Sequence, residues 1–360
     1  MKSRTDLKAG FQFPRLLEKW NRLQNNRQMP WKGEKDPYKI WLSEIILQQT
    51  RVEQGLDYYE RFIKSFPTVH ELASADDKAV YKLWEGLGYY TRCKNLLATA
   101  RYISKELNGK FPDTYDQILK LTGVGVYTAA AISSFAYNLP HAVIDGNVFR
   151  VLARIFGIGE AVDTVQGKKI FFSLAGELLD KKQPGIYNQA MMDFGAVVCK
   201  PSAPLCPGCI FKNHCFAYQH GKVAELPLKA KKNRIRNRWF NYLILTYKNE
   251  VLIRERTEKE IWRHLYEFNL IETKKQGKLS ELLKTACKEN IIEPDKYKML
   301  KLSPVIKQQL SHQLIRGQFV EIELLERNSR MTNGIWVKKQ DLVKYPFPRF
   351  INQYLKQLFD

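Results

Sequence analysis

The pattern of apolar residues changes near residue 222, and this change limits the folds that the chain can adopt. From Leu7 to about His220, apolar residues recur with helical spacing, and short turn segments such as SFPT and NLPHAV separate the periodic stretches. After residue 238, alternating runs such as WFNYLILTY and QFVEIELLE predict strands, whereas LSELLKTACKEN predicts a helix. The sequence therefore predicts a helical domain over residues 1–221 and an α+β domain over residues 239–360.

The stretch between the two predicted domains is strongly basic. Residues 222–238, KVAELPLKAKKNRIRNR, are interrupted by a proline and poor in apolar residues, so we expect a linker. The whole chain carries a formal net charge of +21, which favours a polyanionic partner: nucleic acid first, an anionic membrane surface second. No apolar run reaches the length of a membrane span, and the first ten residues lack the apolar core of a signal peptide. We expect a soluble, cytoplasmic protein.

Four of the six cysteines are crowded into the segment CKPSAPLCPGCIFKNHC. Their spacing is C-x6-C-x2-C-x5-C, and they are Cys199, Cys206, Cys209 and Cys215. Clustered cysteines indicate a metal site in a reducing compartment rather than a disulfide framework. The spacing alone leaves two interpretations open: a structural zinc ion, with His214 or His220 as a fourth ligand, or an iron–sulfur cluster. Cys93 and Cys287 are isolated, and we expect them to be ordinary buried residues.

A glycine pair opens a second motif, LTGVGVYTAAAI, at residues 121–132. Gly123 and Gly125 flank Val124, which predicts a tight hairpin followed at once by a helix of small residues. Free backbone N–H groups at the start of such a helix favour a phosphate. A lone G-x-G is more often a plain turn between helices, but the preceding leucine and the following Tyr-Thr-Ala favour a DNA-binding helix-hairpin-helix over about residues 118–135.

Two acidic residues stand in unusual places. In DPYKIWLSEIILQQT, Asp36 and Pro37 are typical of a helix start, yet Glu44 lies among the apolar residues that follow. A buried carboxylate costs free energy, so Glu44 is either a functional group or a residue at the edge of the core. In AVIDGNVFRVLARIF, Asp145 precedes an amphipathic helix, and a helix cap or turn is the commoner role for such an aspartate.

Six motifs occur in the order and spacing of the MutY family of adenine DNA glycosylases, within the endonuclease III superfamily. They are WLSEIILQQT, EGLGYYTRCKNL, LTGVGVYTAAAI, VIDGNVFRV, NQAMMDFGAVVC and the four cysteines. The chain resembles this family over residues 15–220 and more loosely beyond them. The resemblance implies a two-lobed, all-helical core with a helix-hairpin-helix, one 4Fe–4S cluster in the loop 199–215, and a C-terminal Nudix-like domain. It also implies a monomer that acts on double-stranded DNA.

The resemblance implies hydrolysis of the N-glycosidic bond of adenine mispaired with 8-oxoguanine or guanine. Adenine leaves readily only when protonated, at N7 in the family's mechanism, and this requires an acid that keeps its proton near neutral pH. Desolvation raises the pKa of a glutamate, so the placement of Glu44 suits this role. Asp145 matches the carboxylate that stabilises the oxocarbenium-like sugar and is a candidate covalent partner of C1′. The environments of the two acids should therefore differ.

Tyr127 indicates the subclass. Superfamily members that also cut the strand carry here a lysine that forms a Schiff base, which a phenol cannot do. The resemblance thus implies a monofunctional enzyme in which Tyr127 and Asn147 shape the sugar pocket. The alternative, a bifunctional endonuclease III-like enzyme for oxidised pyrimidines, is disfavoured by Tyr127 and by the extra domain. A non-catalytic DNA-binding protein would not need the two acids.

The resemblance also implies contacts to a flipped-out adenine and to the lesion. Residues matching the adenine pocket are Arg27, Trp31, Leu47 and Gln189. Residues matching contacts to 8-oxoguanine are Gln49, Thr50, Leu87 and Tyr89, together with Ser311 and His312 in QQLSHQLIRG. The alternatives are a glycine-rich turn with aromatic packing at residues 87–90 and a solvated hairpin tip at 311–312. Leu310 stands where family members often carry an aromatic residue.

The chain has no R-E-x-x-E-E-x-G run of metal-binding glutamates, so we expect no pyrophosphatase activity.

Overall fold

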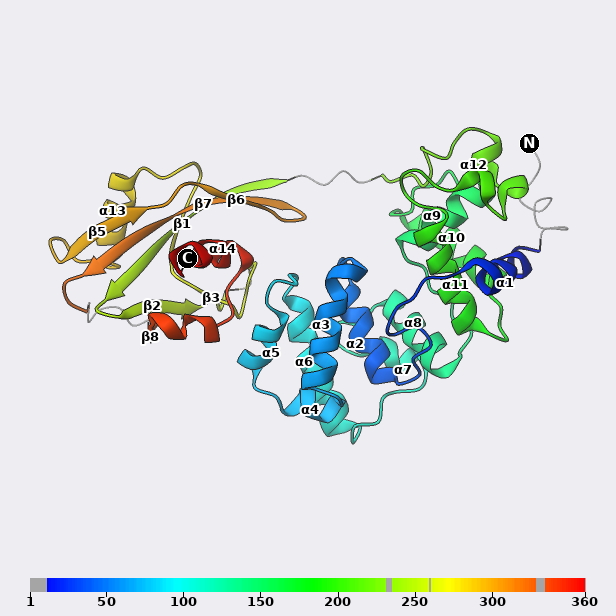
Figure 1. The fold of residues 1–360 in the computed structure, drawn as a ribbon, viewed down its shortest axis with the longest axis horizontal. Coiled ribbons are helices and arrows are strands. Elements are labelled where there is room, and N and C mark those ends of the chain that lie inside the picture. The colour runs from blue at the N-terminus through cyan, green and yellow to red at the C-terminus, as the bar shows by residue number, and fades with distance from the viewer. Residues whose placement is uncertain (1–11, 231–234, 259, 328–333, 360) are drawn as a thin grey trace. The chain divides into compact units, whose positions relative to one another are not determined.

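The chain forms two compact units in the computed structural model, which describes residues 12–230, 235–258, 260–327 and 334–359 (Figure 1). The first unit comprises residues 1–74 and 95–232, and the second comprises residues 75–94 and 233–360. Residues 75–94 thus cluster with the C-terminal part of the chain, although the sequence places them inside the helical domain. Within the second unit, Glu85 Oε1 accepts hydrogen bonds from the backbone N–H of Phe347 (2.8 Å) and from Asn352 Nδ2 (2.6 Å).

Helices build the first unit, as the sequence predicts. In chain order they are α1 (Phe13–Gln24), α2 (Pro37–Leu47), α3 (Val52–Ser65), α4 (Val69–Ser74), α6 (Thr91–Glu106), α7 (Tyr115–Leu119), α8 (Val126–Tyr137), α9 (Gly146–Phe156), α10 (Val165–Leu178), α11 (Pro184–Val197), the short η1 (Cys206–Gly208) and η2 (Lys212–His214), and α12 (Phe216–Gln219). Helices α2, α3, α7 and α8 pack as one group, and α1, α9, α11 and α12 as another. Contacts between α8 and α11 join the two groups, which Figure 1 shows as two lobes of this unit.

Both ends of the expected linker, residues 222–238, make ordered contacts. Leu226 lies in the core of the first unit, and the backbone N–H of Val162 donates to Leu228 O at 3.0 Å. At the other end, Arg238 is buried in strand β1 (Arg236–Tyr247), where its guanidinium group pairs with Glu272. The apolar side chain of Leu226 and the ion pair of Arg238 explain why these ends are ordered. Residues 231–234 lie outside the described residues.

A mixed sheet forms the second unit, and with its helices it confirms the predicted α+β class. The other strands are β2 (Glu250–Glu255), β3 (Tyr266–Glu267), β4 (Asn269–Thr273), β5 (Tyr297–Leu302), β6 (Ile306–Gln309), β7 (Gln313–Leu324) and β8 (Ile335–Lys338). The long strands β1 and β7 pair in parallel, with Arg236 opposite Gln313. The remaining pairs are antiparallel: β4 and β2 with β1, β5 and β6 with β7, and β3 and β8 with β2.

Helices cover both faces of this sheet. The unit contains α5 (Asp77–Trp84), α13 (Leu279–Lys288), η3 (Lys339–Lys344) and α14 (Arg349–Phe359). Leu282 of α13 packs in one core cluster with Leu243 and Val320. On the other face, Tyr354 of α14 stacks on Phe319, with ring centroids 4.1 Å apart. Val320 therefore points to the face covered by α13 and its neighbour Phe319 to the face covered by α14, as the two-residue period of a strand requires.

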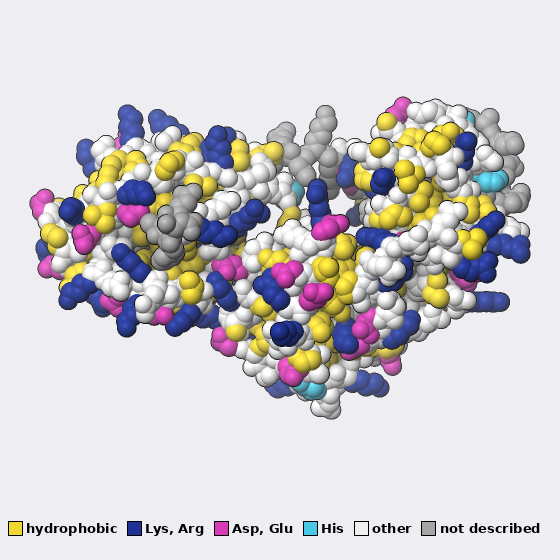
Figure 2. Space-filling view, viewed as in Figure 1, with side chains coloured by type: hydrophobic (Ala, Val, Ile, Leu, Met, Phe, Trp, Pro, Cys, Tyr) yellow, Lys and Arg dark blue, Asp and Glu magenta, His cyan; other side chains and the backbone are white. Residues whose placement is uncertain are grey.

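Two properties bear on the surroundings of the chain. Among the described helices, none is both long and apolar enough to cross a membrane. Lys and Arg side chains are spread over the visible faces of both units, in keeping with the net charge of +21 (Figure 2).

Cys93 is buried as predicted, whereas Cys287 is half-buried.

Candidate active site

Helix α2 carries Glu44 into the interior of the first unit. As the sequence predicts, Asp36 caps this helix, and its carboxylate accepts a hydrogen bond from the backbone N–H of Tyr38 at 2.9 Å. The helix is apolar on nearly all sides, so it is enclosed and takes Glu44 with it. Only 6% of Glu44 is exposed. Glu44 is therefore buried, and its functional role stays a prediction.

The surroundings of Glu44 keep its carboxyl group neutral in mildly acidic solution. Burial raises the pKa of Glu44 to about 7, and the negative charge of Asp145 adds to this shift. The hydroxyl group of Tyr127 acts in the opposite direction, because it donates a hydrogen bond that stabilises the carboxylate. A carboxyl group with a pKa near neutrality can donate a proton and accept it back at physiological pH.

The predicted hairpin positions Tyr127. The hairpin joins α7 to α8, and Gly123 within it has a φ of +80°, a backbone angle that favours glycine. A side chain at Gly123 would also collide with Asn95, 2.7 Å from the position of a Cβ atom. Gly125 caps α8 without a side chain, so the first N–H groups of that helix remain accessible. Tyr127 follows in the first turn, and its hydroxyl group is enclosed, which raises the pKa of the phenol well above its usual value.

Asp145 is both a helix cap and a member of the site. Its Oδ1 accepts a hydrogen bond from the backbone N–H of Val148 (2.7 Å), and its Oδ2 accepts one from Asn147 Nδ2 (2.6 Å). Burial raises the pKa of Asp145 above its usual value, and these two hydrogen bonds act against that rise without reversing it. The environments of the two acids thus differ: Asp145 receives two short hydrogen bonds at the start of α9, where the helix dipole favours the anion.

Arg150 connects this cap to the cysteine segment. One nitrogen of its guanidinium group donates to Asn147 Oδ1 at 2.8 Å, and its Nε donates to the backbone oxygen of Cys199 at 2.7 Å. The same side chain also donates to the backbone oxygen of Gly195 at 2.7 Å. The amide of Asn147 is therefore held from both sides, by Asp145 and by Arg150.

One cavity of about 640 Å³ gathers most of the predicted site. Its lining includes ten residues chosen from the sequence: Arg27, Trp31, Glu44, Leu47, Gln49, Thr50, Tyr127, Asp145, Asn147 and Gln189. It also includes residues that were not predicted: Met29, Gln48, Arg51, Val52, Ile144, Gly146, Phe149 and Met192. Among the described residues that line it there is no lysine.

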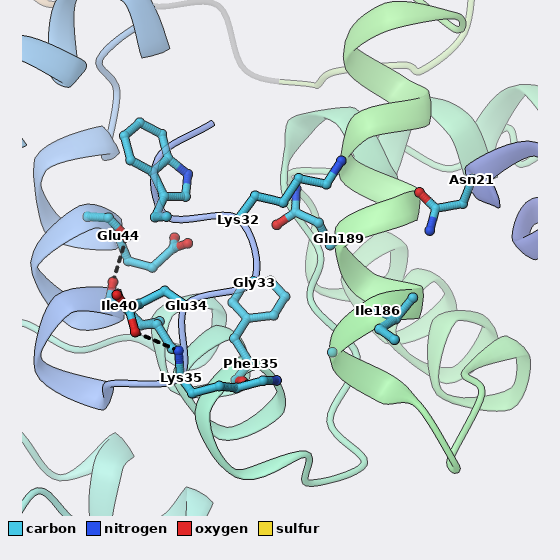
Figure 3. Close-up of a pocket in the computed structure, with 13 residues that line it drawn as sticks. Asn21, Lys32, Gly33, Glu34, Lys35, Ile40, Glu44, Phe135, Ile186 and Gln189 are labelled. Atoms are coloured by element: carbon cyan, nitrogen blue, oxygen red, sulfur yellow. Dashed lines mark hydrogen bonds between the residues drawn. The ribbon is translucent and has the colours of Figure 1, made fainter. Parts of the chain in front are cut away.

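A second, smaller cavity of about 200 Å³ shares Trp31, Glu44 and Gln189 with the first. Figure 3 shows Glu44 entering this space from α2 and Gln189 entering it from α11 on the opposite side. Glu44 thus lines both cavities, although the residue is buried.

The predicted lesion contacts fall into two groups. Gln49 and Thr50 follow α2 directly and line the large cavity, and Gln49 is exposed with a φ of +56°. Tyr89 belongs to the second unit, has a φ of +50°, and is 43% exposed. A positive φ is unusual for residues other than glycine, and backbone strain of this kind can mark a functional site as well as a turn. Leu87, in contrast, is buried, so the interpretation as a packed turn describes Leu87 but not Tyr89.

Ser311 and His312 lie exposed at the tip of the hairpin between β6 and β7. Within the second unit, the Ser311 hydroxyl group is hydrogen-bonded to the phenol of Tyr89. The backbone oxygen of His312 accepts from the N–H of Arg236 at 2.9 Å, which ties the tip to the start of β1. Leu310 is half-exposed beside them.

The four clustered cysteines are half-buried free thiols near the core formed by α1, α9 and α11. Two of their sulfur atoms have nitrogen partners: Arg154 lies 3.5 Å from Cys199 Sγ, and the N–H of Phe211 donates to Cys209 Sγ at 3.4 Å. Among the described residues, no group of three or more Cys, His, Asp or Glu is arranged to hold a single metal ion. His220, an alternative zinc ligand, stacks on Phe216 instead. Two of the four thiols thus have N–H partners, and hydrogen bonds to sulfur are a feature of iron–sulfur sites.

The sequence analysis missed Asp193, although it named two of its partners, Arg27 and Gln189. Asp193 is fully buried on α11 and pairs with Arg27 and Lys32. Its signal was available, because an aspartate in the apolar run NQAMMDFGAVV is as unusual as Glu44 in α2. The long-range pairing with residues 25–32 could not be read from the pattern.

Known proteins share this architecture. The family model of HhH-GPD superfamily base excision DNA repair proteins matches residues 42–172, and the NUDIX domain model matches residues 241–357. Among solved structures, a thermostable thymine-DNA glycosylase aligns with a TM-score of 0.54 and 28% identity over 61% of this chain and 99% of that one. Endonuclease III in a non-covalent complex with DNA aligns with a TM-score of 0.50 over 61% of this chain and 98% of that one; at 19% identity, it shows likeness of fold.

Curated relatives give the family. The adenine DNA glycosylase of Buchnera aphidicola subsp. Baizongia pistaciae (strain Bp) is 37% identical over 71% of this chain and 73% of its own length. The adenine DNA glycosylase of Mus musculus is 40% identical over 57% of this chain and 42% of its own length. Together with the helix-hairpin-helix core and the NUDIX domain, these matches show that the chain belongs to the adenine DNA glycosylase family.

Proposed function

We propose that the chain hydrolyses the N-glycosidic bond of adenine mispaired with 8-oxoguanine or guanine in double-stranded DNA. One observation carries this proposal above all: Glu44 and Asp145 line one cavity but have different hydrogen-bonding environments. Glycoside hydrolysis needs one carboxyl group that is neutral and one that is charged. The cavity of about 640 Å³ is large enough for a flipped-out nucleotide.

Glu44 acts as the general acid. Its carboxyl group transfers a proton to the extruded adenine, so that the base departs as a neutral molecule with the electron pair of the broken bond. The enclosed hydroxyl group of Tyr127 then stabilises the resulting carboxylate. Because water is largely excluded around Glu44, this hydrogen bond is stronger than it would be in solution.

Asp145 faces the positive charge that develops on the sugar. Its carboxylate stabilises the oxocarbenium-like C1′, either through space or as a transient covalent partner, until water adds at that carbon. The bonds from Val148 and Asn147 keep the anion in place. Asn147 is itself held by Arg150, so the charged group does not have to reorganise during the reaction.

The reaction ends at base release. Tyr127 occupies the position from which a lysine would form a Schiff base, and no lysine is found among the described residues lining the large cavity. The product is therefore an intact strand with an abasic site. A bifunctional activity on oxidised pyrimidines would need an amine at this place.

DNA is held through its backbone and read at the lesion. In the hairpin of Gly123, Val124 and Gly125, the two glycines are exposed and offer their N–H groups to a phosphate, whereas Val124 is buried and its N–H donates to Leu121 O at 3.1 Å. The charge of +21 supplies long-range attraction. Gln49, Thr50 and the exposed Tyr89 contact the opposite base, with Ser311 and His312 as donors to 8-oxoguanine. Leu87 supports the turn that presents Tyr89.

The cysteine segment holds one 4Fe–4S cluster, with Cys199, Cys206, Cys209 and Cys215 as ligands. Support comes from four free thiols in one segment, two of which have nitrogen partners. The cluster would supply structural stability to the segment that contacts Arg150. None of the six cysteines forms a disulfide, which suits a reducing, cytoplasmic location. The residues of the site come from one chain, so a monomer suffices.

Three duplexes test this function. They carry adenine opposite 8-oxoguanine, guanine or thymine, and the purified chain is incubated with each, followed by alkaline cleavage of abasic sites on a gel. We expect release from the first two duplexes and not from the third. Equal release from all three, or none from any, contradicts the proposal. Borohydride addition should trap no covalent complex; a trapped complex would support the bifunctional alternative.

A further inference from the structure

Four hydrogen-bond donors converge on the buried carboxylate of Asp193 in α11. Its Oδ1 accepts from Arg27 NH1 and from Gln189 Nε2, each at 2.9 Å. Its Oδ2 accepts from Asn25 Nδ2 at 2.9 Å and from Lys32 Nζ at 3.0 Å. Asp193 has no exposed surface, so these groups replace the water that a carboxylate would otherwise bind. Two of its four partners, Arg27 and Gln189, line the large cavity.

The charge of Asp193 determines which way the amide of Gln189 faces. With two cationic side chains at 3.0 Å or less, Asp193 is ionised, and an ionised carboxylate can only accept hydrogen bonds. The amide atom 2.9 Å from Oδ1 must therefore be the NH₂ group, because an oxygen there would be repelled. It follows that Gln189 presents its carbonyl oxygen to the side away from Asp193.

That carbonyl oxygen belongs to a residue that lines both cavities with Glu44 and Trp31. Figure 3 shows Gln189 and Glu44 on opposite sides of the smaller cavity. An acceptor at this place complements the exocyclic NH₂ group of adenine, which is a donor. A 6-oxopurine carries a carbonyl oxygen, which is an acceptor, at the same position. That oxygen would face the Gln189 oxygen with no hydrogen-bond donor between the two.

We propose that Asp193 is a positioning residue that holds the Gln189 amide in one orientation and thereby makes the site select 6-aminopurines over 6-oxopurines. This inference rests on the proposed function and adds the origin of base selectivity. A site whose buried acceptor is left unpaired discriminates strongly, so we expect a preference of about ten- to one-hundredfold. An amide free to rotate could offer its NH₂ group to the 6-oxo oxygen and lose most of that preference.

The test compares release of adenine and hypoxanthine in single turnovers, from duplexes that differ only at this base. Asp193→Asn is nearly isosteric, but its own NH₂ group can donate to the Gln189 oxygen and so permit the turned amide. We expect the adenine-to-hypoxanthine ratio of rate constants to fall about tenfold in Asp193→Asn. Asn25→Ala is the matched control, because it removes another partner of Asp193 and leaves the Gln189 contact intact. Its ratio should equal that of the wild-type chain.

A double-mutant cycle separates positioning from a general loss of structure. In a Gln189→Ala background, Asp193→Asn should leave the ratio unchanged, because the residue through which it acts is absent. A ratio that is unchanged by Asp193→Asn in the wild-type background, or that falls equally in both backgrounds, overturns the proposal. If the wild-type chain releases adenine from no duplex, the proposed function fails rather than this inference.

One measurement does not depend on any Asp193 variant being folded. The side-chain NH₂ resonances of Gln189, assigned by their loss in Gln189→Ala, should exchange slowly with solvent because a buried carboxylate holds them. NH₂ protons that exchange as fast as those of exposed glutamines would contradict the orientation.

Discussion

The hydroxyl group of Tyr127 is hydrogen-bonded to the carboxyl group of Glu44, inside the same cavity that contains Asp145. Because the phenol favours the carboxylate form, it lowers the pKa of Glu44, while burial raises that pKa further than the phenol lowers it. The pKa of Glu44 is thus the result of two opposed effects, the burial of α2 and the hydrogen bond from Tyr127 of α8.

Tyr127→Phe should therefore move the pH profile of base release toward alkaline pH. Without the phenol, the pKa of Glu44 rises above about 7, and the acid stays protonated to higher pH. Single-turnover rates between pH 6 and 9 measure this. A midpoint shifted toward acidic pH would mean that Tyr127 stabilises the protonated acid instead.

Asp145→Asn should slow base release by about 10²–10³-fold and leave the fold intact. The asparagine side chain can still cap α9 through its oxygen, but it lacks the charge that faces the cationic sugar. Release rates and circular dichroism provide the measurement. A variant with wild-type rates would leave Asp145 with only its role as a cap.

The chain purified without oxygen should be brown and contain about four irons and no stoichiometric zinc. Cys206→Ser should lose most of this iron, while Cys287→Ser, a matched control in the second unit, should keep it. Elemental analysis decides the matter: stoichiometric zinc in place of iron would establish the structural zinc site that the spacing alone leaves open.

Replacing both Ser311 and His312 by alanine should reduce the preference for 8-oxoguanine over guanine opposite adenine. Each lost polar contact is worth about 1 kcal/mol, so the ratio of rates should fall by roughly tenfold or more. Lys307→Gln, on the neighbouring strand β6, is the control for a change in this hairpin. An unchanged ratio in the double variant would make the hairpin tip a solvated turn and leave lesion reading to Gln49, Thr50 and Tyr89.

Much of this architecture could be predicted because its signals are local. The cap of Asp36 and Pro37, the glycines of the hairpin and the alternation in β7 are set by neighbouring residues. The burial of Glu44 could also be inferred, since a helix with apolar residues on every side has to be enclosed.

The rest depends on contacts between distant parts of the chain. The partners of Asp193 lie 161 to 168 residues away, apart from Gln189. The hydrogen bonds of Glu85 to Phe347 and Asn352 span more than 260 residues, so the sequence pattern could not indicate that residues 75–94 cluster with the C-terminal part of the chain. Residues 222–230 read as linker, but the burial of Leu226 depends on a core that local composition does not reveal.

The most direct test of the central claim is the pH dependence of adenine release by the wild-type chain and by Glu44→Gln. A carboxyl group with its pKa raised to about 7 is protonated below that pH, so the wild-type rate constant should be constant in mild acid. It should fall about tenfold per pH unit above pH 7. Glu44→Gln, which keeps the shape but has no acidic proton, should be at least 10²-fold slower and show no such titration. A Glu44→Gln chain that releases adenine at the wild-type rate, with the same dependence on pH, would show that Glu44 is not the proton donor.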